Sequence, residues 1–248
     1  MYLNRHVKDK EVFLKFGSNS KESSHDTVIV RVLLKNKIHV NRRMVQMDQK
    51  TLLSLSYNKL RRFDMSLLAV YDEEGRLLEV ERDYEKISQR LASIGIRFER
   101  WEAKVELPWS AGQEEVLEAY KEDVERIVKE FGFKSIDVVS LTPEHPKKEE
   151  LRNMFLSEHT HSDFEVRFFV DGCGTFYLHP EDKVYVVLCE KGDFISVPAN
   201  TKHWFDMGTE PFFKAIRFFS IPDGWVANFT GSDISKKIPS HDQILKLR

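Results

Sequence analysis

Four side chains in the C-terminal half of the chain have the types and spacing of a metal site. His159 and His161 precede Glu165 in the run His-Thr-His-Ser-Asp-Phe-Glu, and His203 follows far downstream. Three imidazoles and one carboxylate form a ligand set for a divalent first-row metal. An H-x-H pair alone arises easily by chance, so the prediction of a metal site depends on its surroundings.

The spacing of the four residues suits strands better than a helix. In an extended segment, residues two apart point to the same face, so His159 and His161 project together. Glu165 lies four residues after His161 and can therefore point to that face as well. His203 is distant in sequence. We therefore expect a sheet that curls or closes to bring it to the other three.

The segment Glu165–Val170 places a second charged side chain beside the carboxylate. Glu165 and Arg167 share one face of the expected strand, while Val166 and Phe168 share the other. Unpaired charges inside an apolar core are costly. A bound metal together with an anionic ligand would satisfy both charged groups.

The composition is that of a soluble globular protein with one large or two small domains. The chain has 248 residues, of which 41% are hydrophobic and 31% charged. No apolar run approaches the about 18 residues of a membrane helix, and the N-terminus lacks the apolar core of a secretory signal. Cys173 and Cys189 give no disulfide framework, so we expect a cytoplasmic setting and no membrane partner.

Charge divides the chain into two parts. Residues 1–64 carry a net charge of +8 and residues 65–248 a net charge of −10, counted from Lys, Arg, Asp and Glu. Periodicity in 1–64 is weak, although Thr27–Leu34 is a candidate strand, and no nucleic-acid-binding module is present. We interpret 1–64 as a basic, poorly ordered extension, with Met65 as a candidate natural start, and 65–248 as the functional domain.

Residues 65–248 predict a mainly β fold with flanking helices, of the α+β class. Helices are expected over 84–94, 114–131 and 146–155, and strands over 136–141, 163–170, 174–179, 183–189, 193–197, 213–219 and 225–229. Asp171-Gly172 predicts a hairpin turn. Short strands at regular spacing are typical of a sandwich or small barrel.

Two spaced motifs resemble those of the cupin barrels, which fold as a double-stranded β-helix or jelly roll. They read His159-x-His161-x3-Glu165-x6-Gly172 and Gly192-x5-Pro198-x4-His203, with Asn200 where many cupins have Gly. Longer segments resemble one cupin family, acireductone dioxygenase, between Met65 and Pro239. These segments are Gly95–Trp101, Glu158–His161, Glu165–Val170, Leu188–Lys191, Ile195–Pro198, His203–Gly208 and Gly224–Gly231.

The resemblance implies an enzyme of methionine salvage that cleaves 1,2-dihydroxy-3-keto-5-methylthiopentene with O2. It implies that His159, His161, Glu165 and His203 hold one Fe2+ or Ni2+ per chain. In this family iron gives formate and 4-methylthio-2-oxobutanoate, whereas nickel gives formate, carbon monoxide and 3-methylthiopropionate. The side chains that would bind the metal are the same for both ions, so the sequence does not choose between them.

The resemblance also implies roles for side chains beside the metal. Arg167 would pair with the substrate, which is acidic and binds as an anion, since a guanidinium offers several fixed donors and stays charged. Phe155, Phe205 and Trp225 would line an apolar pocket for the methylthio tail. Ordinary packing inside a barrel is the alternative interpretation of each aromatic residue.

Two other functions remain open on the sequence. One is a different metal-dependent cupin enzyme, a dioxygenase or a sugar isomerase, although aromatic surroundings disfavour a sugar. The other is a non-catalytic cupin that binds metal or a small ligand. In every case we expect small-molecule partners, no nucleic acid, and a monomer.

Overall fold

The computed structural model describes residues 10–15, 27–33, 37–40, 66–102, 107–220 and 226–248, in two compact units, Met1–Arg62 and Phe63–Arg248. In the first unit, β1 (Lys10–Lys15), β2 (Thr27–Leu33) and β3 (Lys37–Val40) form an antiparallel sheet in the order β1-β2-β3. The candidate strand over 27–34 is thus present as β2. The interpretation of residues 1–64 as an extension apart from the functional domain stays a prediction.

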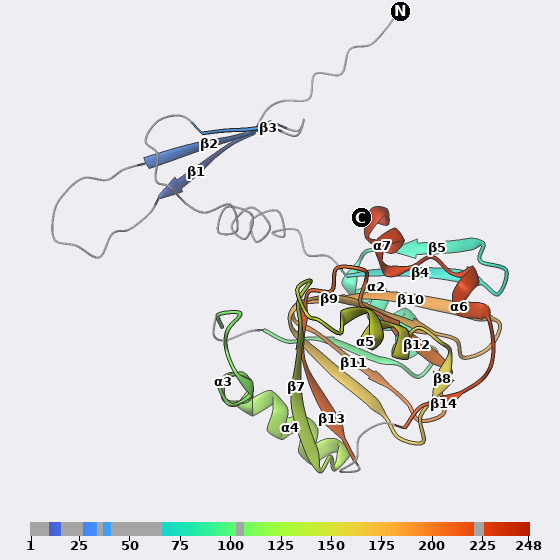
Figure 1. Ribbon diagram of the computed structural model, residues 1–248. Coiled ribbons are helices and arrows are strands. Elements are labelled where there is room, and N and C mark those ends of the chain that lie inside the picture. Colours follow the sequence, from blue (N-terminus) through green and yellow to red (C-terminus); the bar gives the residue numbers. More distant parts are fainter. Residues whose placement is uncertain (1–9, 16–26, 34–36, 41–65, 103–106, 221–225) are drawn as a thin grey trace, which may run out of the picture. The chain divides into compact units, whose positions relative to one another are not determined.

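The second unit consists of two antiparallel sheets that share one long strand, β9 (Glu165–Leu178) (Figure 1). This confirms the mainly β class with flanking helices. The first sheet has the order β14 (Asn228–Phe229), β8 (His159–Thr160), β12 (His203–Asp206), β9, β10 (Lys183–Glu190), β4 (Leu67–Asp72), β5 (Leu77–Glu81). The second has the order β6 (Arg97–Arg100), β11 (Asp193–Val197), β9, β13 (Phe213–Phe219), β7 (Ser135–Leu141).

Strand β9 bends at Gly172 and passes from one sheet to the other. Its first half pairs with β11 and β13, and its second half pairs with β10 and β12. The expected hairpin at Asp171-Gly172 is therefore wrong. Gly172 has φ 71°, and a Cβ there would lie 1.9 Å from the carbonyl oxygen of Phe212, so only glycine fits this corner. The pairing with β13 shifts register next to the corner, between Lys214 and Ala215, as at a β-bulge.

Some helices cover the outer faces of the sheets, and others pack against the hydrophobic cluster between the sheets. The helices are α2 (Tyr84–Ala92), α3 (Gln113–Ala119), α4 (Lys121–Phe131), α5 (Lys148–Phe155), α6 (Ile234–Lys237) and α7 (His241–Ile244), followed by the 3-10 turn η1 (Leu245–Leu247). The single helix expected over 114–131 is divided into α3 and α4 at Tyr120, whose ψ of 20° is not helical. Tyr120 is buried edge-on against Phe168, with ring centroids 4.7 Å apart, so packing on the sheet accompanies the break.

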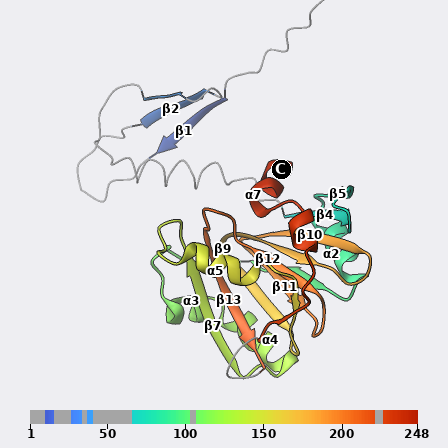
Figure 2. The same cartoon turned by 45° about the vertical axis from the view of Figure 1, so that its right-hand side comes forward.

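Alternation along β9 separates two hydrophobic clusters. Phe169 belongs to the cluster between the two sheets, whereas Val166 and Phe168 belong to the cluster beneath α4, with Val124 and Ile127. Both views of the molecule place α4 beside β7 and β13 (Figures 1 and 2). Glu165 and Arg167 lie an even number of residues from Phe169, so they point to the same face of the strand. The strand therefore carries two charged side chains into the interior between the sheets.

The C-terminal tail is fixed to strand β12, which begins at His203. The backbone N–H of His241 donates to Oδ2 of Asp206 over 2.9 Å, and Nε of Arg152 donates to Oδ1 over 2.7 Å. Burial alone would raise the pKa of Asp206, but the Arg152 guanidinium and the N–H groups of His241 and Gly208 outweigh it and lower that pKa. The tail thus holds an ionised carboxylate at the end of a strand that carries a site residue.

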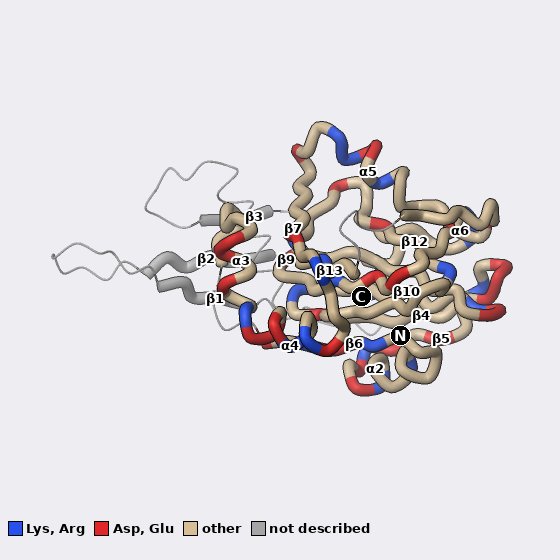
Figure 3. Tube along the Cα trace, turned by 90° about the horizontal axis from the view of Figure 1, so that it is seen from below, with Lys and Arg blue, Asp and Glu red and all other residues tan. Residues whose placement is uncertain are grey.

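Charged residues lie mainly on helices and turns, while the central strands carry few of them (Figure 3). Within the described ranges, no helix has both the length and the apolar character needed to cross a membrane.

Candidate metal centre

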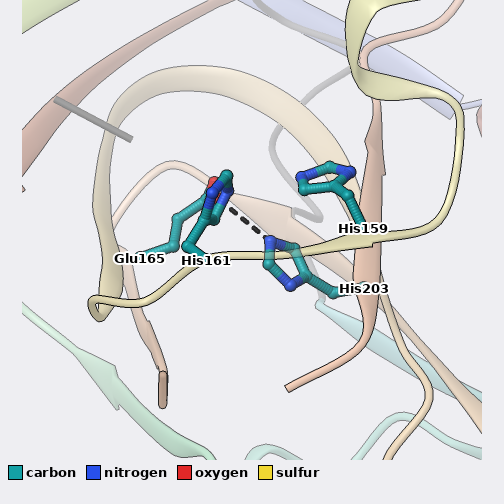
Figure 4. Close-up of side chains that lie close together, drawn as sticks. All are labelled: His159, His161, Glu165 and His203. Carbon is teal, nitrogen blue, oxygen red and sulfur yellow. Dashed lines mark hydrogen bonds and ion pairs between the residues drawn. The ribbon is translucent and has the colours of Figure 1, made fainter. Parts of the chain in front are cut away.

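The structure brings together the four residues that the sequence predicts as metal ligands. His159 lies in β8 and His161 directly after it, while Glu165 and His203 are the first residues of β9 and β12. His159 and His203 are direct partners across the β8–β12 pair. One potential ligand atom from each residue lies within 4.8 Å of the others, and all four side chains are buried (Figure 4).

Each of the three imidazoles is fixed by a backbone carbonyl. Each Nδ1 atom lies 2.7–2.8 Å from a backbone carbonyl oxygen. The carbonyl belongs to Ser157 for His159, to Val226 for His161 and to Thr201 for His203. A carbonyl can only accept, so each Nδ1 carries the proton and donates. In the neutral ring the lone pair therefore lies on Nε2, which is the form that binds a metal.

The carboxylate of Glu165 faces two of these lone pairs. Its Oε2 lies 3.1 Å from Nε2 of His161 and 3.0 Å from Nε2 of His203 (Figure 4). Three imidazole lone pairs and a carboxylate in one buried space repel each other unless a cation or protons lie among them. This donor set and its fixed tautomers fit a divalent metal ion.

Arg167 lies beside Glu165, as the alternation of the strand predicts. It is 3% exposed, and its Nη2 lies 2.7 Å from Oε1 of Glu165. The guanidinium carbon lies 4.3 Å from the ring centroid of Phe205, 5.2 Å from that of Phe176 and 5.9 Å from that of Phe155. A permanent positive charge thus stands between the carboxylate and a group of aromatic faces, which attract cations.

The three aromatic residues predicted to line the substrate pocket differ in burial and in whether the structure describes them. Phe205 is fully buried and Phe155, on α5, is half-buried, and both face Arg167. Trp225 lies outside the described residues. Phe176 was missed by the sequence analysis. It pairs with Phe205 across β9 and β12, so only knowledge of that strand pairing could have placed it beside Arg167.

The protonation tendencies follow from burial and from the Glu165–Arg167 pair. Burial would raise the pKa of Glu165, but Arg167 and the two facing imidazoles outweigh it and hold that pKa well below its usual range. Burial and the nearby His203 lower the pKa of His159 to about 4. Burial opposes protonation of His161 as well, yet its bond to Glu165 raises its pKa overall.

Comparison with known proteins gives one consistent family. The model of the ARD/ARD' family matches residues 68–227. An acireductone dioxygenase from Hydrogenobaculum sp. (strain Y04AAS1) is 73% identical over 183 residues, covering 74% of this chain and all of the relative. One from Aquifex aeolicus (strain VF5) is 54% identical over 181 residues, covering 73% of this chain and 99% of the relative.

A solved structure gives the same result for the fold. The acireductone dioxygenase from Bacillus anthracis with a cadmium ion in its active centre matches with a TM-score of 0.61 and 30% identity. The match covers 66% of this chain and 98% of that one. The similarity confirms the expected cupin-type barrel.

Proposed function

Because the chain belongs to the ARD/ARD' family, we propose that its buried centre of three histidines and one glutamate is the active site of an acireductone dioxygenase. The protein is a metal-dependent dioxygenase of methionine salvage that acts on a small-molecule acireductone and dioxygen. The observation that carries the placement of the site is the convergence of the Nε2 atoms and the Glu165 carboxylate.

His159, His161, Glu165 and His203 would hold one Fe2+ or Ni2+. The three carbonyl-bound Nδ1–H groups support this assignment, since they place the lone pair of each neutral ring on Nε2, the atom that would coordinate the ion. The bound ion would supply Lewis acidity to the oxygen atoms of the substrate.

Arg167 would bind the substrate anion and orient Glu165. The substrate is an acidic enediol, so a buried guanidinium holds its charged form in place. The contact of Arg167 with Oε1 of Glu165 leaves Oε2 directed at His161 and His203. The surrounding aromatic rings exclude water, which strengthens the charge interaction.

The apolar end of the substrate would lie among the aromatic residues near Arg167. Phe155 and Phe205 support this proposal by their positions, and Trp225 would complete the pocket for the methylthio tail. We expect the 2-keto acid precursor of methionine and formate with iron, and methylthiopropionate, carbon monoxide and formate with nickel. A cytoplasmic monomer is also part of this proposal.

Oxygen uptake with a synthetic acireductone tests the function directly. Metal-free protein would be loaded with Fe2+ or Ni2+, and the products would be separated by chromatography with a gas assay for carbon monoxide. Metal-dependent uptake with cleavage of the acireductone is the expected result. Metal binding without uptake would instead indicate a non-catalytic cupin, and turnover of a sugar would indicate an isomerase.

A further inference from the structure

The three imidazoles differ in where their carbonyl acceptors come from. His159 and His203 each bond a carbonyl two residues earlier in the chain, at Ser157 and Thr201. His161 bonds the carbonyl of Val226, which is 65 residues away. The orientation of His161 therefore depends on how a distant segment is held, whereas the other two rings are held locally.

The described residues of the segment that carries Val226 expose much of their apolar surface. It continues into β14, which has two residues and pairs with β8 at two positions, Asn228 with Thr160 and Phe229 with His159. Val226 is 64% exposed and Phe229 is 60% exposed. Burial of these two side chains thus contributes little, and the polar contacts of the described residues 226–230 carry more weight.

Glu158 supplies those polar contacts from a buried position. Its Oε1 accepts from the hydroxyl of Thr230 over 2.6 Å, and its backbone oxygen accepts from the N–H of Thr230 over 3.1 Å. Its Oε2 accepts from Nδ1 of His179 over 2.6 Å, which fixes the carboxylate from the other side. Hydrogen bonds to a carboxylate are stronger than those between neutral groups.

We infer that Glu158 and Thr230 are positioning residues: together they hold the Val226 carbonyl on Nδ1 of His161 and so orient that imidazole for the metal. This inference rests on the proposed metal centre. Partners behind a metal ligand fix its tautomer and ring orientation, so their loss weakens metal binding although they never touch the ion. The effect should be largest at His161, and His203 is the internal reference, because its acceptor Thr201 lies away from β14 whereas His159 itself pairs with Phe229.

A pair of substitutions at Thr230 tests the inference in the full chain. Thr230→Val keeps the shape and removes the hydroxyl, whereas Thr230→Ser keeps the hydroxyl. Ser88→Ala is a matched control, because it removes a hydroxyl that donates to the Phe98 carbonyl over 2.9 Å at α2, away from the centre. Metal-free protein would be titrated with Co2+ and followed by its ligand-field absorbance.

We expect Thr230→Val to bind Co2+ about 10-fold more weakly, while Thr230→Ser and Ser88→Ala stay close to the parent protein. In Zn2+-loaded, 15N-histidine-labelled protein, the Nδ1 proton of His161 should exchange faster in Thr230→Val. The Nδ1 proton of His203, which bonds the Thr201 carbonyl, should keep its exchange rate. This selectivity separates positioning from a general loss of stability.

Unchanged Co2+ affinity in Thr230→Val, or equally accelerated exchange at His161 and His203, would overturn the inference. His161→Ala separates this failure from failure of the proposed centre. If His161→Ala loses Co2+ and Thr230→Val does not, the positioning role alone is wrong. If neither variant changes Co2+ binding, the metal centre itself is wrong.

Discussion

Replacing Arg167 by methionine removes a buried guanidinium while keeping an apolar side chain of similar length. Two consequences follow from its position. The substrate anion loses a charged partner, and Glu165 loses the ion pair at its Oε1. The first consequence concerns catalysis and the second concerns stability, so one variant tests both parts of the proposed role.

The catalytic effect can be bounded from the chemistry of the contact. A hydrogen bond to a charged group contributes about 1.5–3 kcal/mol. Since 1.36 kcal/mol corresponds to a factor of ten, kcat/KM should fall by about one to two decades. The full burial of Arg167 and the Phe205 ring at 4.3 Å place the contact toward the upper end of that range.

The effect on stability should depend on the metal. Leaving a buried charge without its partner destabilises a protein by about 3–5 kcal/mol. Metal-free Arg167→Met should therefore show the larger loss in the free energy of unfolding. With metal bound, the positive charge of the ion compensates Glu165, and the loss should be smaller.

The assay combines oxygen uptake at equal metal content with thermal unfolding in the presence and absence of Ni2+. Arg100→Met is the matched control, because it removes a guanidinium paired with Asp193 outside the site. Wild-type kcat/KM in fully metal-loaded Arg167→Met would show that Arg167 has only a structural role. An identical stability loss with and without metal would show that Glu165 is not shared between Arg167 and the ion.

Four further outcomes are expected. His203→Ala should sharply lower the metal content measured by elemental analysis, since it removes one of four ligands. A chain of residues 65–248 should fold, bind metal and consume oxygen like the full chain, and an insoluble or inactive product would contradict this. Gly172→Ala should lower the free energy of unfolding by about 2–4 kcal/mol in denaturant titrations, because φ is positive and the Phe212 carbonyl blocks a Cβ. The folded-state pKa of Asp206 is lowered, so its contribution to stability is present above about pH 4 and is lost as the pH falls through the folded pKa; acid unfolding curves of Asp206→Asn should show a weaker pH dependence in that window and lower stability at neutral pH.

The parts of the site that follow from local periodicity could be predicted from the sequence. Alternation alone places Glu165 and Arg167 on one face and Val166 and Phe168 on the other, and the structure has the same division. Strand β11 has the expected bounds and β10 differs by one residue. These elements are regular, and their patterns lie within a few consecutive residues.

The parts that failed depend on partners distant in sequence. Asp171-Gly172 has the local signature of a hairpin, but a bulged corner needs the same positive φ, and only the pairing with β13 distinguishes the two. Strand β8 has two residues and β12 four, too few for a periodic signal. The carbonyl of Val226 has no side-chain signature at all, so its bond to His161 could not be anticipated.

Strand β9 makes the length of the chain between Glu165 and Gly172 invariable. Its first residue faces the histidines and its corner admits only glycine, so both ends of this stretch are fixed in space. Inserting or deleting one residue there would exchange the two faces and turn Arg167 outward beneath α4. The connection between β9 and β10, residues 179–182, has no such constraint from the sheet corner. Variation within this stretch is thus restricted to substitution, and changes in chain length must fall in connections elsewhere.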